Sequence, residues 1–161
     1  MEGKFGVDVG GVILDRGNDR EDTSLFGPNY LSAKPTVGAV EAVAKLCEMF
    51  EGRVYIVSKC GQNVENKTRE WMKHNKFHER TGVGEDHLRF CRERKDKAPI
   101  AKELGLTHFV DDRLEILEYL KGIVGTRFLF RPTGNEINLI RKGPAIMVFS
   151  WAELLEYMGA A

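Results

Sequence analysis

Short apolar runs alternate with longer amphipathic segments along the chain. Each run is rich in branched or aromatic residues and is bounded by glycine or polar residues, a pattern that predicts a buried strand. The runs with this pattern lie at 4–9, 53–57, 107–110, 126–130 and 145–149, and a weaker candidate lies at 88–91. We therefore expect a sheet assembled from several short strands.

Between these runs, apolar residues recur at helical spacing. The predicted helices lie at 36–50, 63–76, 99–105 and 114–120, with a final helix after Ser150. Thr36 and Ser150 suit N-cap positions, because a side-chain hydroxyl can accept a hydrogen bond from the first turn of a helix. Strands that alternate with helices predict an α/β fold: a three-layer, Rossmann-like parallel sheet with helices on both faces.

A long polar segment separates the first strand from the first helix. Residues 15–35 are rich in charged and small polar side chains and are too few to form an independent cap domain. A connection of this length is either functional or simply solvated, and the sequence leaves both readings open. Because residues 1–161 contain no repeat, low-complexity segment or linker, we expect a single domain without a large cap.

Composition narrows the classes of partner. The chain has 161 residues with 24 Lys plus Arg and 24 Asp plus Glu, and this zero formal charge argues against general nucleic-acid binding. No apolar run approaches the roughly 18 residues that a membrane-spanning helix requires. The N-terminus is too polar for a signal peptide, and the few, widely spaced cysteines favour reduced thiols, so a cytoplasmic protein is expected.

Acidic residues follow two of the predicted strands. Asp8 comes at the end of the first run, and Asp111 and Asp112 come directly after Val110. If these strands are neighbours in a parallel sheet, the three carboxylates meet at its carboxyl edge, where open α/β sheets bind ligands. Like charges repel, so such a cluster needs a cation, and oxygen ligands of this kind suit Mg²⁺.

Two further residues fit phosphate chemistry at that edge. Ser58 follows the run at 53–57, and Lys97 precedes the predicted helix at 99–105. An aspartate can attack phosphorus, a serine hydroxyl can hydrogen-bond a phosphoryl oxygen, and a lysine can offset negative charge. Lys97 also ends a run of charged residues at 92–97, and such runs are commonly solvated surface.

The order of these residues resembles the haloacid dehalogenase-like (HAD) superfamily. The resemblance covers most of the chain, from Phe5 through at least Leu117. Its four short motifs correspond to Asp8-Val9-Gly10-Gly11-Val12, Ile56-Val57-Ser58, Lys97 and Val110-Asp111-Asp112. The resemblance implies a Rossmann-like sheet, a Mg²⁺ cofactor and phosphatase activity on a phosphorylated small molecule or macromolecule.

By the same resemblance, Asp8 is a metal ligand and the nucleophile that forms an aspartyl-phosphate. Asp111 binds the metal, Asp112 does so directly or through water, and Gly10 contributes its backbone carbonyl. Asp112 has a simpler alternative role as the cap of the helix that follows it.

The resemblance also implies a set of groups that hold the phosphoryl group. Ser58 and Lys97 act on that group and count as catalytic. Lys59, Gly10 and Gly11 are further candidates for substrate binding. Lys95 competes with Lys97 for the third-motif role, since spacing alone does not separate the two.

Gly10 departs from the family pattern. Phosphatases of this superfamily carry a second aspartate at this position, which protonates the leaving group and then activates water. Losing such a group typically costs about 10²–10⁴-fold in rate. We therefore expect metal and phosphate binding to survive while turnover suffers, unless Asp15 or Glu21 from the polar segment replaces the missing acid.

Two other functions remain open from the sequence. A HAD-like chain without its second aspartate could be a catalytically inactive module that binds Mg²⁺ and a phosphorylated ligand. The segment Val7-Asp8-Val9-Gly10-Gly11 also looks like the first phosphate loop of actin-like sugar kinases. Those kinases need two related domains, which 161 residues with one acidic-pair strand do not supply.

Overall fold

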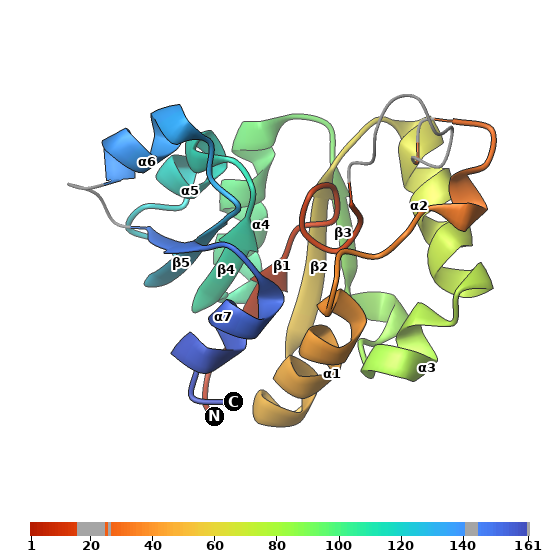
Figure 1. Ribbon diagram of the computed structural model, residues 1–161, viewed down its shortest axis with the longest axis horizontal. Coiled ribbons are helices and arrows are strands. Elements are labelled where there is room, and N and C mark those ends of the chain that lie inside the picture. The colour runs from red at the N-terminus through yellow and green to blue at the C-terminus, as the bar shows by residue number, and fades with distance from the viewer. Residues whose placement is uncertain (16–24, 26, 141–144, 161) are drawn as a thin grey trace.

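A six-stranded parallel sheet forms the centre of the molecule (Figure 1). The computed structural model describes residues 1–15, 25, 27–140 and 145–160. The strands are β1 (Phe5–Val7), β2 (Val54–Lys59), β3 (Leu88–Cys91), β4 (His108–Asp111), β5 (Thr126–Phe130) and β6 (Ile146–Val148). Every neighbouring pair is parallel, which confirms the α/β class predicted from the alternation of runs.

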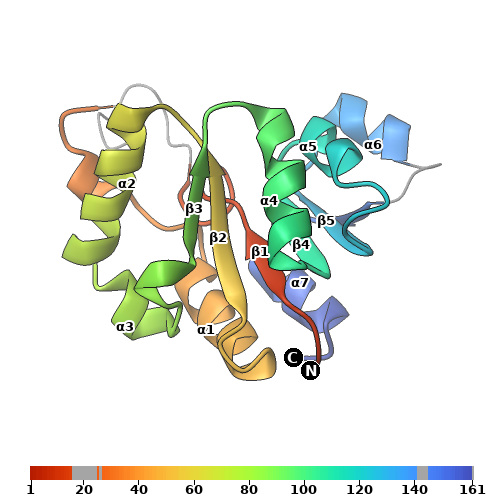
Figure 2. The same cartoon turned by 180° about the vertical axis from the view of Figure 1, so that it is seen from behind.

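Helices cover both faces of this sheet, as Figures 1 and 2 show from opposite sides. The helices are α1 (Ala39–Met49), α2 (Gln62–His74), α3 (Phe77–Thr81), α4 (Lys97–Leu104), α5 (Leu114–Tyr119), α6 (Gly134–Ile140) and α7 (Trp151–Tyr157). Short 3₁₀ turns are η1 (Tyr30–Ser32), η2 (Glu85–His87) and η3 (Arg94–Asp96). The predicted three-layer arrangement is therefore confirmed.

Alternate residues of each strand pack into two separate cores. Ile56 and Val110 face a core that includes side chains of α1, α2, α3 and α7. Their neighbours in the chain, Val57 after Ile56 and Phe109 before Val110, face the other core, which is formed with α4 and α5. Successive side chains of a strand point to opposite faces, so strands buried on both sides read as continuous apolar runs.

The order of the strands places the candidate site. The sheet runs β3-β2-β1-β4-β5-β6, so the chain builds outward in one direction from β1 and then in the other from β4. Val7 of β1 pairs with Val110 of β4, which makes these two strands neighbours at the point of reversal. Open α/β sheets bind ligands outside the carboxyl ends of the strands at this switch point.

The start of the first helix differs from the prediction. α1 begins at Ala39 after Gly38, whose φ of 77° is left-handed, and Thr36 is not its cap. The backbone of Thr36 links the first loop to the helix, because its N–H donates to the carbonyl of Ile13 and its carbonyl accepts from the N–H of Ala39. Val37, which lies within the predicted helix at 36–50, precedes α1 and is 85% exposed.

Other elements agree with or add to the sequence-based expectations. The weak strand candidate at 88–91 is β3, and the Ser150 hydroxyl accepts a hydrogen bond from Glu153 N at the start of α7. α3 and α6 were not predicted. α3 has only five residues, too few to show a period, and α6 opens with Gly134-Asn135, both poor helix formers.

The segment between β1 and α1 contains no cap domain in its described part. Residues 16–24 and 26 of the predicted polar segment lie outside the described residues, and so does Glu21. The described remainder includes η1 and a short antiparallel bridge between Leu14 and Pro35. Within the part of the chain that the structure describes, no helix is both long and apolar enough to cross a membrane.

Candidate metal and phosphate site

Asp8 follows directly on β1 and keeps its backbone in the sheet. Its N–H donates to the carbonyl of Val110 at 3.1 Å, one step beyond the last paired residue of β1. The chain then turns sharply, since the carbonyl of Val9 accepts hydrogen bonds from the N–H groups of Ile13 and Leu14. This turn leaves the Asp8 side chain at the carboxyl edge, where it is 7% exposed.

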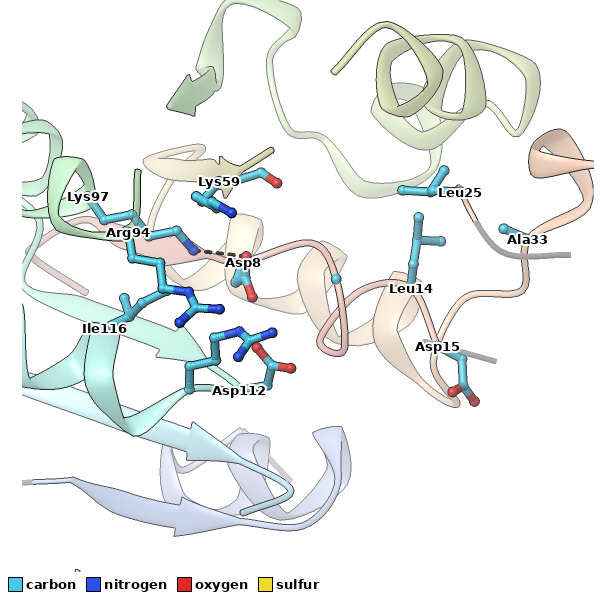
Figure 3. Close-up of a pocket in the computed structure, with 13 residues that line it drawn as sticks. Asp8, Leu14, Asp15, Leu25, Ala33, Lys59, Arg94, Lys97, Asp112 and Ile116 are labelled. Atoms are coloured by element: carbon cyan, nitrogen blue, oxygen red, sulfur yellow. Dashed lines mark hydrogen bonds and ion pairs between the residues drawn. The ribbon is translucent and has the colours of Figure 1, made fainter. Parts of the chain in front are cut away.

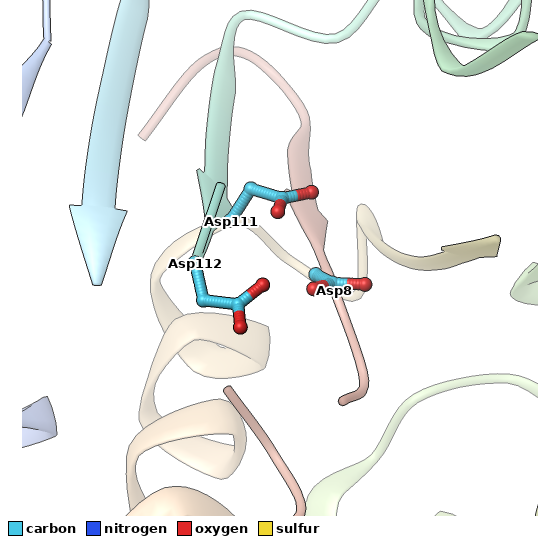
Figure 4. A group of neighbouring side chains, drawn as sticks. All are labelled: Asp8, Asp111 and Asp112. Carbon is cyan, nitrogen blue, oxygen red and sulfur yellow. The ribbon is translucent and has the colours of Figure 1, made fainter. Parts of the chain in front are cut away.

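Three carboxylates converge at this edge (Figure 4). Asp8, Asp111 and Asp112 each offer one oxygen, and these oxygens lie within 4.8 Å of one another. Asp111 is fully buried, while Asp112 is partly exposed. Such a set of hard oxygen donors, partly open to solvent, fits a divalent cation like Mg²⁺, which keeps waters and binds through a few carboxylates. The sequence-based expectation that these side chains meet agrees with this geometry.

Lys97 connects two of the carboxylates. Its Nζ donates to Asp8 Oδ1 at 2.9 Å and to Asp111 Oδ2 at 2.7 Å. The side chain is 1% exposed, so it is no part of a solvated charge cluster. Burial alone would lower the pKa of Lys97, but the attraction of Asp8 and Asp111 outweighs burial and raises that pKa. The ammonium is therefore charged throughout the neutral range.

Lys95, the competing candidate, lies away from this cluster. Its side chain is 67% exposed and pairs with Glu93 at 3.3 Å on the surface. The difference arises because η3 ends at Asp96 and α4 begins at Lys97, which turns only Lys97 inward. The geometry thus selects Lys97 as the lysine beside Asp8.

The charge state of Asp111 depends on its neighbours. Burial raises its pKa, Asp8 raises it further, and Lys97 acts in the opposite direction. Asp111 Oδ1 accepts a hydrogen bond from the backbone N–H of Arg113 at 3.0 Å, so both oxygens have a partner. A divalent cation among the three carboxylates would favour the ionised form of Asp111, because the charge of an ion reverses the effect of its neighbours on pKa.

A pocket of about 500 Å³ opens above Asp8 (Figure 3). Ser58 and Lys59, at the end of β2, line it together with Lys97 and Asp112. Ser58 is 6% exposed and Lys59 is exposed, so the two offer a fixed hydroxyl and a more accessible ammonium. The apolar walls of this pocket are formed by Leu14, Leu25, Ala33 and Ile116.

Two arginines in this pocket were missed from the sequence. Arg94 and Arg113 both line it, and Arg94 is held by Glu115 at 2.8 Å. Arg113 follows Asp112 directly, so its position beside the acidic pair was a signal that could have been used. Arg94 lies in η3 within the run of charges, and nothing in that run separates it from its neighbours.

The two glycines of the first motif lie in different places. Gly10 lines the main pocket, has an ordinary backbone conformation, and would meet nothing within 4 Å if it carried a Cβ. Gly11 has a φ of 77° and lines a second pocket of about 430 Å³ that shares Asp112 and Arg113 with the first. Gly11 therefore faces a different space from the one expected.

Asp112 is not the residue at the N-cap of α5. That position belongs to Arg113, and the N–H of Leu114 donates to Glu136 Oε2 at 3.1 Å. Glu136 comes from α6, a helix that sequence analysis did not predict, and no motif in the sequence pointed to it.

Solved structures resemble the chain closely in fold, whereas neither a protein-family model nor a curated protein matches it. A D,D-heptose 1,7-bisphosphate phosphatase from B. bronchiseptica, complexed with magnesium and phosphate, aligns with a TM-score of 0.66 and 16% identity. That alignment covers 96% of this chain and 97% of the other. The enzyme of the same name from Burkholderia thailandensis aligns with a TM-score of 0.64 and 14% identity, covering 99% of this chain and 100% of the other. A structure described as a haloacid dehalogenase-like hydrolase from Burkholderia xenovorans aligns with a TM-score of 0.64 and 14% identity, covering 94% of each chain.

Proposed function

We propose that this chain, whose fold is that of the haloacid dehalogenase-like hydrolases, is a Mg²⁺-dependent phosphatase that acts through Asp8. The observation that carries the proposal is the meeting of three carboxylates, those of Asp8, Asp111 and Asp112, with the ammonium of Lys97. Asp8, Asp112 and Lys97 line one pocket. The fold alone hosts many activities, so the argument rests on these side chains. We further propose that residues 1–161 form one domain and that the protein acts in the cytoplasm.

The proposed chemistry begins with the Asp8 carboxylate attacking phosphorus. The bond to the leaving group breaks, and an aspartyl-phosphate forms on Asp8. Lys97 holds Asp8 Oδ1 and supplies positive charge where the carboxylate and the phosphoryl group approach each other. When bound by Asp8, Asp111, Asp112 and the carbonyl of Gly10, Mg²⁺ would supply charge neutralisation at the phosphoryl oxygens.

The remaining groups of the pocket would hold the substrate. The Ser58 hydroxyl and the Lys59 ammonium lie on the β2 side, and both can donate to phosphoryl oxygens. Arg113 adds a planar guanidinium on the opposite side, suited to a second pair of oxygens. Gly11, which lines the second pocket, would contact only a substrate that extends that far.

Among the residues that the structure describes, no evident acid serves the transfer to Asp8 and no evident base serves the hydrolysis that follows. Gly10 has no side chain to protonate a leaving group or to activate water for hydrolysis of the aspartyl-phosphate. Asp15 also lines the pocket, but Figure 3 shows its carboxylate pointing away from Asp8. Glu21 lies outside the described residues. We propose that turnover is slow and restricted to substrates whose leaving groups need little protonation.

The substrate class we favour is a phosphorylated small molecule. Two of the similar structures are phosphatases named for a sugar bisphosphate, and one was obtained with magnesium and phosphate. At 14–16% sequence identity the likeness is one of fold and identifies no sugar, so the preference for a phosphorylated small molecule remains a proposal. A pocket without a cap in its described part would also admit a phosphate group on a macromolecule.

The proposal is tested by a screen of aryl, acyl and alkyl phosphates with and without Mg²⁺. We expect phosphate release that requires Mg²⁺ and disappears in Asp8→Asn. Brief incubation with ³²P-labelled acyl phosphate followed by acid quenching should leave label on the wild-type protein and none on the variant. Absence of both release and label, in protein shown to bind Mg²⁺, would contradict a phosphatase.

A second candidate function is a non-catalytic module that binds a phosphorylated ligand. The observation that favours it is Gly10, since the candidate metal-binding carboxylates lie together while position 10 carries no acidic side chain. It predicts that phosphate with Mg²⁺ raises the melting temperature although no substrate turns over. The alternative of a sugar kinase-like phosphotransferase gains no support from the similar structures, which are named as phosphatases and a hydrolase.

A further inference from the structure

Glu136 has an evident structural role in its own helix. Its backbone N–H donates to Thr133 Oγ1 at 3.3 Å, and its Oε1 accepts from Thr133 N at 2.9 Å. Thr133-Gly134-Asn135-Glu136 is therefore a capping box, in which two side chains satisfy the N–H groups at the start of α6. This role uses only one of the two oxygens of the carboxylate.

The second oxygen reaches a different element. Glu136 Oε2 accepts the N–H of Leu114 at 3.1 Å, although 22 positions separate the two residues. Leu114 is the first residue of α5 and lies two positions after Asp112. The first N–H groups of a helix have no partner within it, and the N-cap residue Arg113 offers no side-chain cap here.

Two carboxylates thus hold successive N–H groups of the turn that carries Asp112. Arg113 N donates to Asp111 Oδ1 at 3.0 Å, and Leu114 N donates to Glu136 Oε2. Asp111 is the last residue of β4 and directly precedes the turn, whereas Glu136 anchors the turn from α6. Glu136 and Asp112 both line the second pocket, so the anchor lies close to the carboxylate whose turn it holds.

We propose that Glu136 is a positioning residue that orients the turn 112–114 and thereby sets the affinity of the acidic cluster for Mg²⁺. The inference rests on the metal site of the proposed function and adds a residue to it. Hydrogen bonds that end on an ionised group are stronger than neutral ones, so the carboxylate is well suited to fixing a backbone. Groups that orient metal ligands typically contribute 10–100-fold to metal affinity.

The charge of Glu136 is consistent with this role. Burial raises the pKa of Glu136, but hydrogen bonds from Thr133 and Leu114 outweigh burial and lower it. The carboxylate is therefore ionised at neutral pH and can accept both bonds at once. A glutamine has one oxygen acceptor, so it can keep one of the two bonds but not both.

Glu153 provides a matched control within the same chain. Glu153 N donates to Ser150 Oγ at 3.0 Å, and Glu153 Oε2 accepts from Phe149 N at 3.3 Å, which forms the same kind of capping contact on α7. Neither bond touches the turn 112–114. Replacing Glu153 therefore removes a helix cap without changing the neighbours of the acidic cluster.

The test measures Mg²⁺ dissociation constants by titration calorimetry and melting temperatures without metal. We expect Glu136→Ala and Glu153→Ala both to lower the melting temperature, Glu136→Ala by more because it also loses the bond to Leu114 N. Only Glu136→Ala should weaken Mg²⁺ binding, by about 10–100-fold, and Glu136→Gln should bind with intermediate affinity. Thr133→Ala, which keeps the bond between Leu114 and Glu136, should bind Mg²⁺ as the wild type does.

The outcomes separate this inference from the proposed function. A folded wild-type protein that binds no Mg²⁺ would overturn the metal site and the inference together. Wild-type affinity in Glu136→Gln and Glu136→Ala, or an equal loss in Glu153→Ala, would overturn the positioning role alone. If Glu136→Ala does not fold, the comparison of Glu136→Gln with Thr133→Ala decides in the same way.

Discussion

The ammonium of Lys97 lies 2.9 Å from Asp8 Oδ1, although 89 positions separate these residues in the sequence. The same ammonium bonds Asp111, so one buried cation holds two carboxylates that would otherwise repel each other. Lys97 therefore holds two members of the acidic cluster together, and a bound Mg²⁺ would add to this arrangement.

Replacing Lys97 should damage both stability and activity. Lys97→Met leaves Asp8 and Asp111 buried without their cation, and breaking a buried ion pair from one side costs about 3–5 kcal/mol. We expect the free energy of unfolding, measured in urea without metal, to fall by this amount, and to fall less with saturating Mg²⁺. Phosphatase activity should be lost. Lys95→Met, which removes an exposed lysine from the same segment, should resemble the wild type in both measurements. Equal effects of the two substitutions would contradict the assignment of Lys97.

Mg²⁺ should stabilise the protein more as pH rises. Burial raises the pKa of Asp111, so the folded state without metal binds a proton more tightly than the unfolded state does. Its contribution to stability is present at low pH and is lost as pH rises through the folded pKa. Bound Mg²⁺ favours the ionised carboxylate, so the gain in melting temperature on adding Mg²⁺ should grow between about pH 5 and about pH 8.

Asp111→Asn is the control for this dependence. Asparagine does not titrate, so the melting temperature of the variant, measured without metal because Asp111 is itself a proposed ligand, should lose most of the pH dependence contributed at this position. If adding Mg²⁺ raises the melting temperature of the wild type more at about pH 5 than at about pH 8, then Asp111 is already ionised in the protein without metal.

Substrates should be ranked by their leaving groups. Without an acid at Gly10, the rate of transfer to Asp8 depends on how well the departing oxygen carries negative charge. We expect acyl and aryl phosphates to be cleaved faster than alkyl phosphates, in steady-state assays that compare kcat/KM at saturating Mg²⁺. Equal values for aryl and alkyl phosphates would show that another group, such as Asp15, supplies the proton.

The sheet could be predicted from the sequence because its strands are buried on both faces. Their apolar runs are continuous, and glycine or polar residues bound each run, so the α/β class and the three-layer arrangement could be predicted. The positions of Asp8 and Asp111 at the carboxyl edge followed as well, since each ends such a run. Helix starts were harder to predict: Thr36 is a residue type that suits an N-cap, yet α1 begins at Ala39 with Gly38 at its N-cap position.

Parts of the site depended on contacts that local sequence does not encode. Lys95 and Lys97 are two positions apart, and only the junction of η3 with α4 decides which one is buried. Glu136 was not found because α6 begins with residues that disfavour helices. Its contact with Leu114 is set by the packing of α6 beside α5, which no spacing in the sequence reveals.

Gly10→Asp should restore an acid at the position where the family resemblance places one. The substitution is sterically feasible, because Gly10 has an ordinary backbone conformation and open space around its Cβ position. If the missing acid limits turnover, phosphate release should rise by about 10²–10⁴-fold, most for alkyl phosphates, which need protonation most. The gain should require Mg²⁺ and should disappear when Asp8→Asn is added.

Gly11→Asp is the matched control for that substitution. It introduces the same carboxylate one residue later, but Gly11 has a φ of 77°, where a side chain strains the backbone. We expect this variant to melt at a lower temperature and to gain no activity. A folded, Mg²⁺-binding Gly10→Asp protein without any gain would mean that more than one catalytic group is missing. The reading as a ligand-binding module would then explain the site better than a slow phosphatase does.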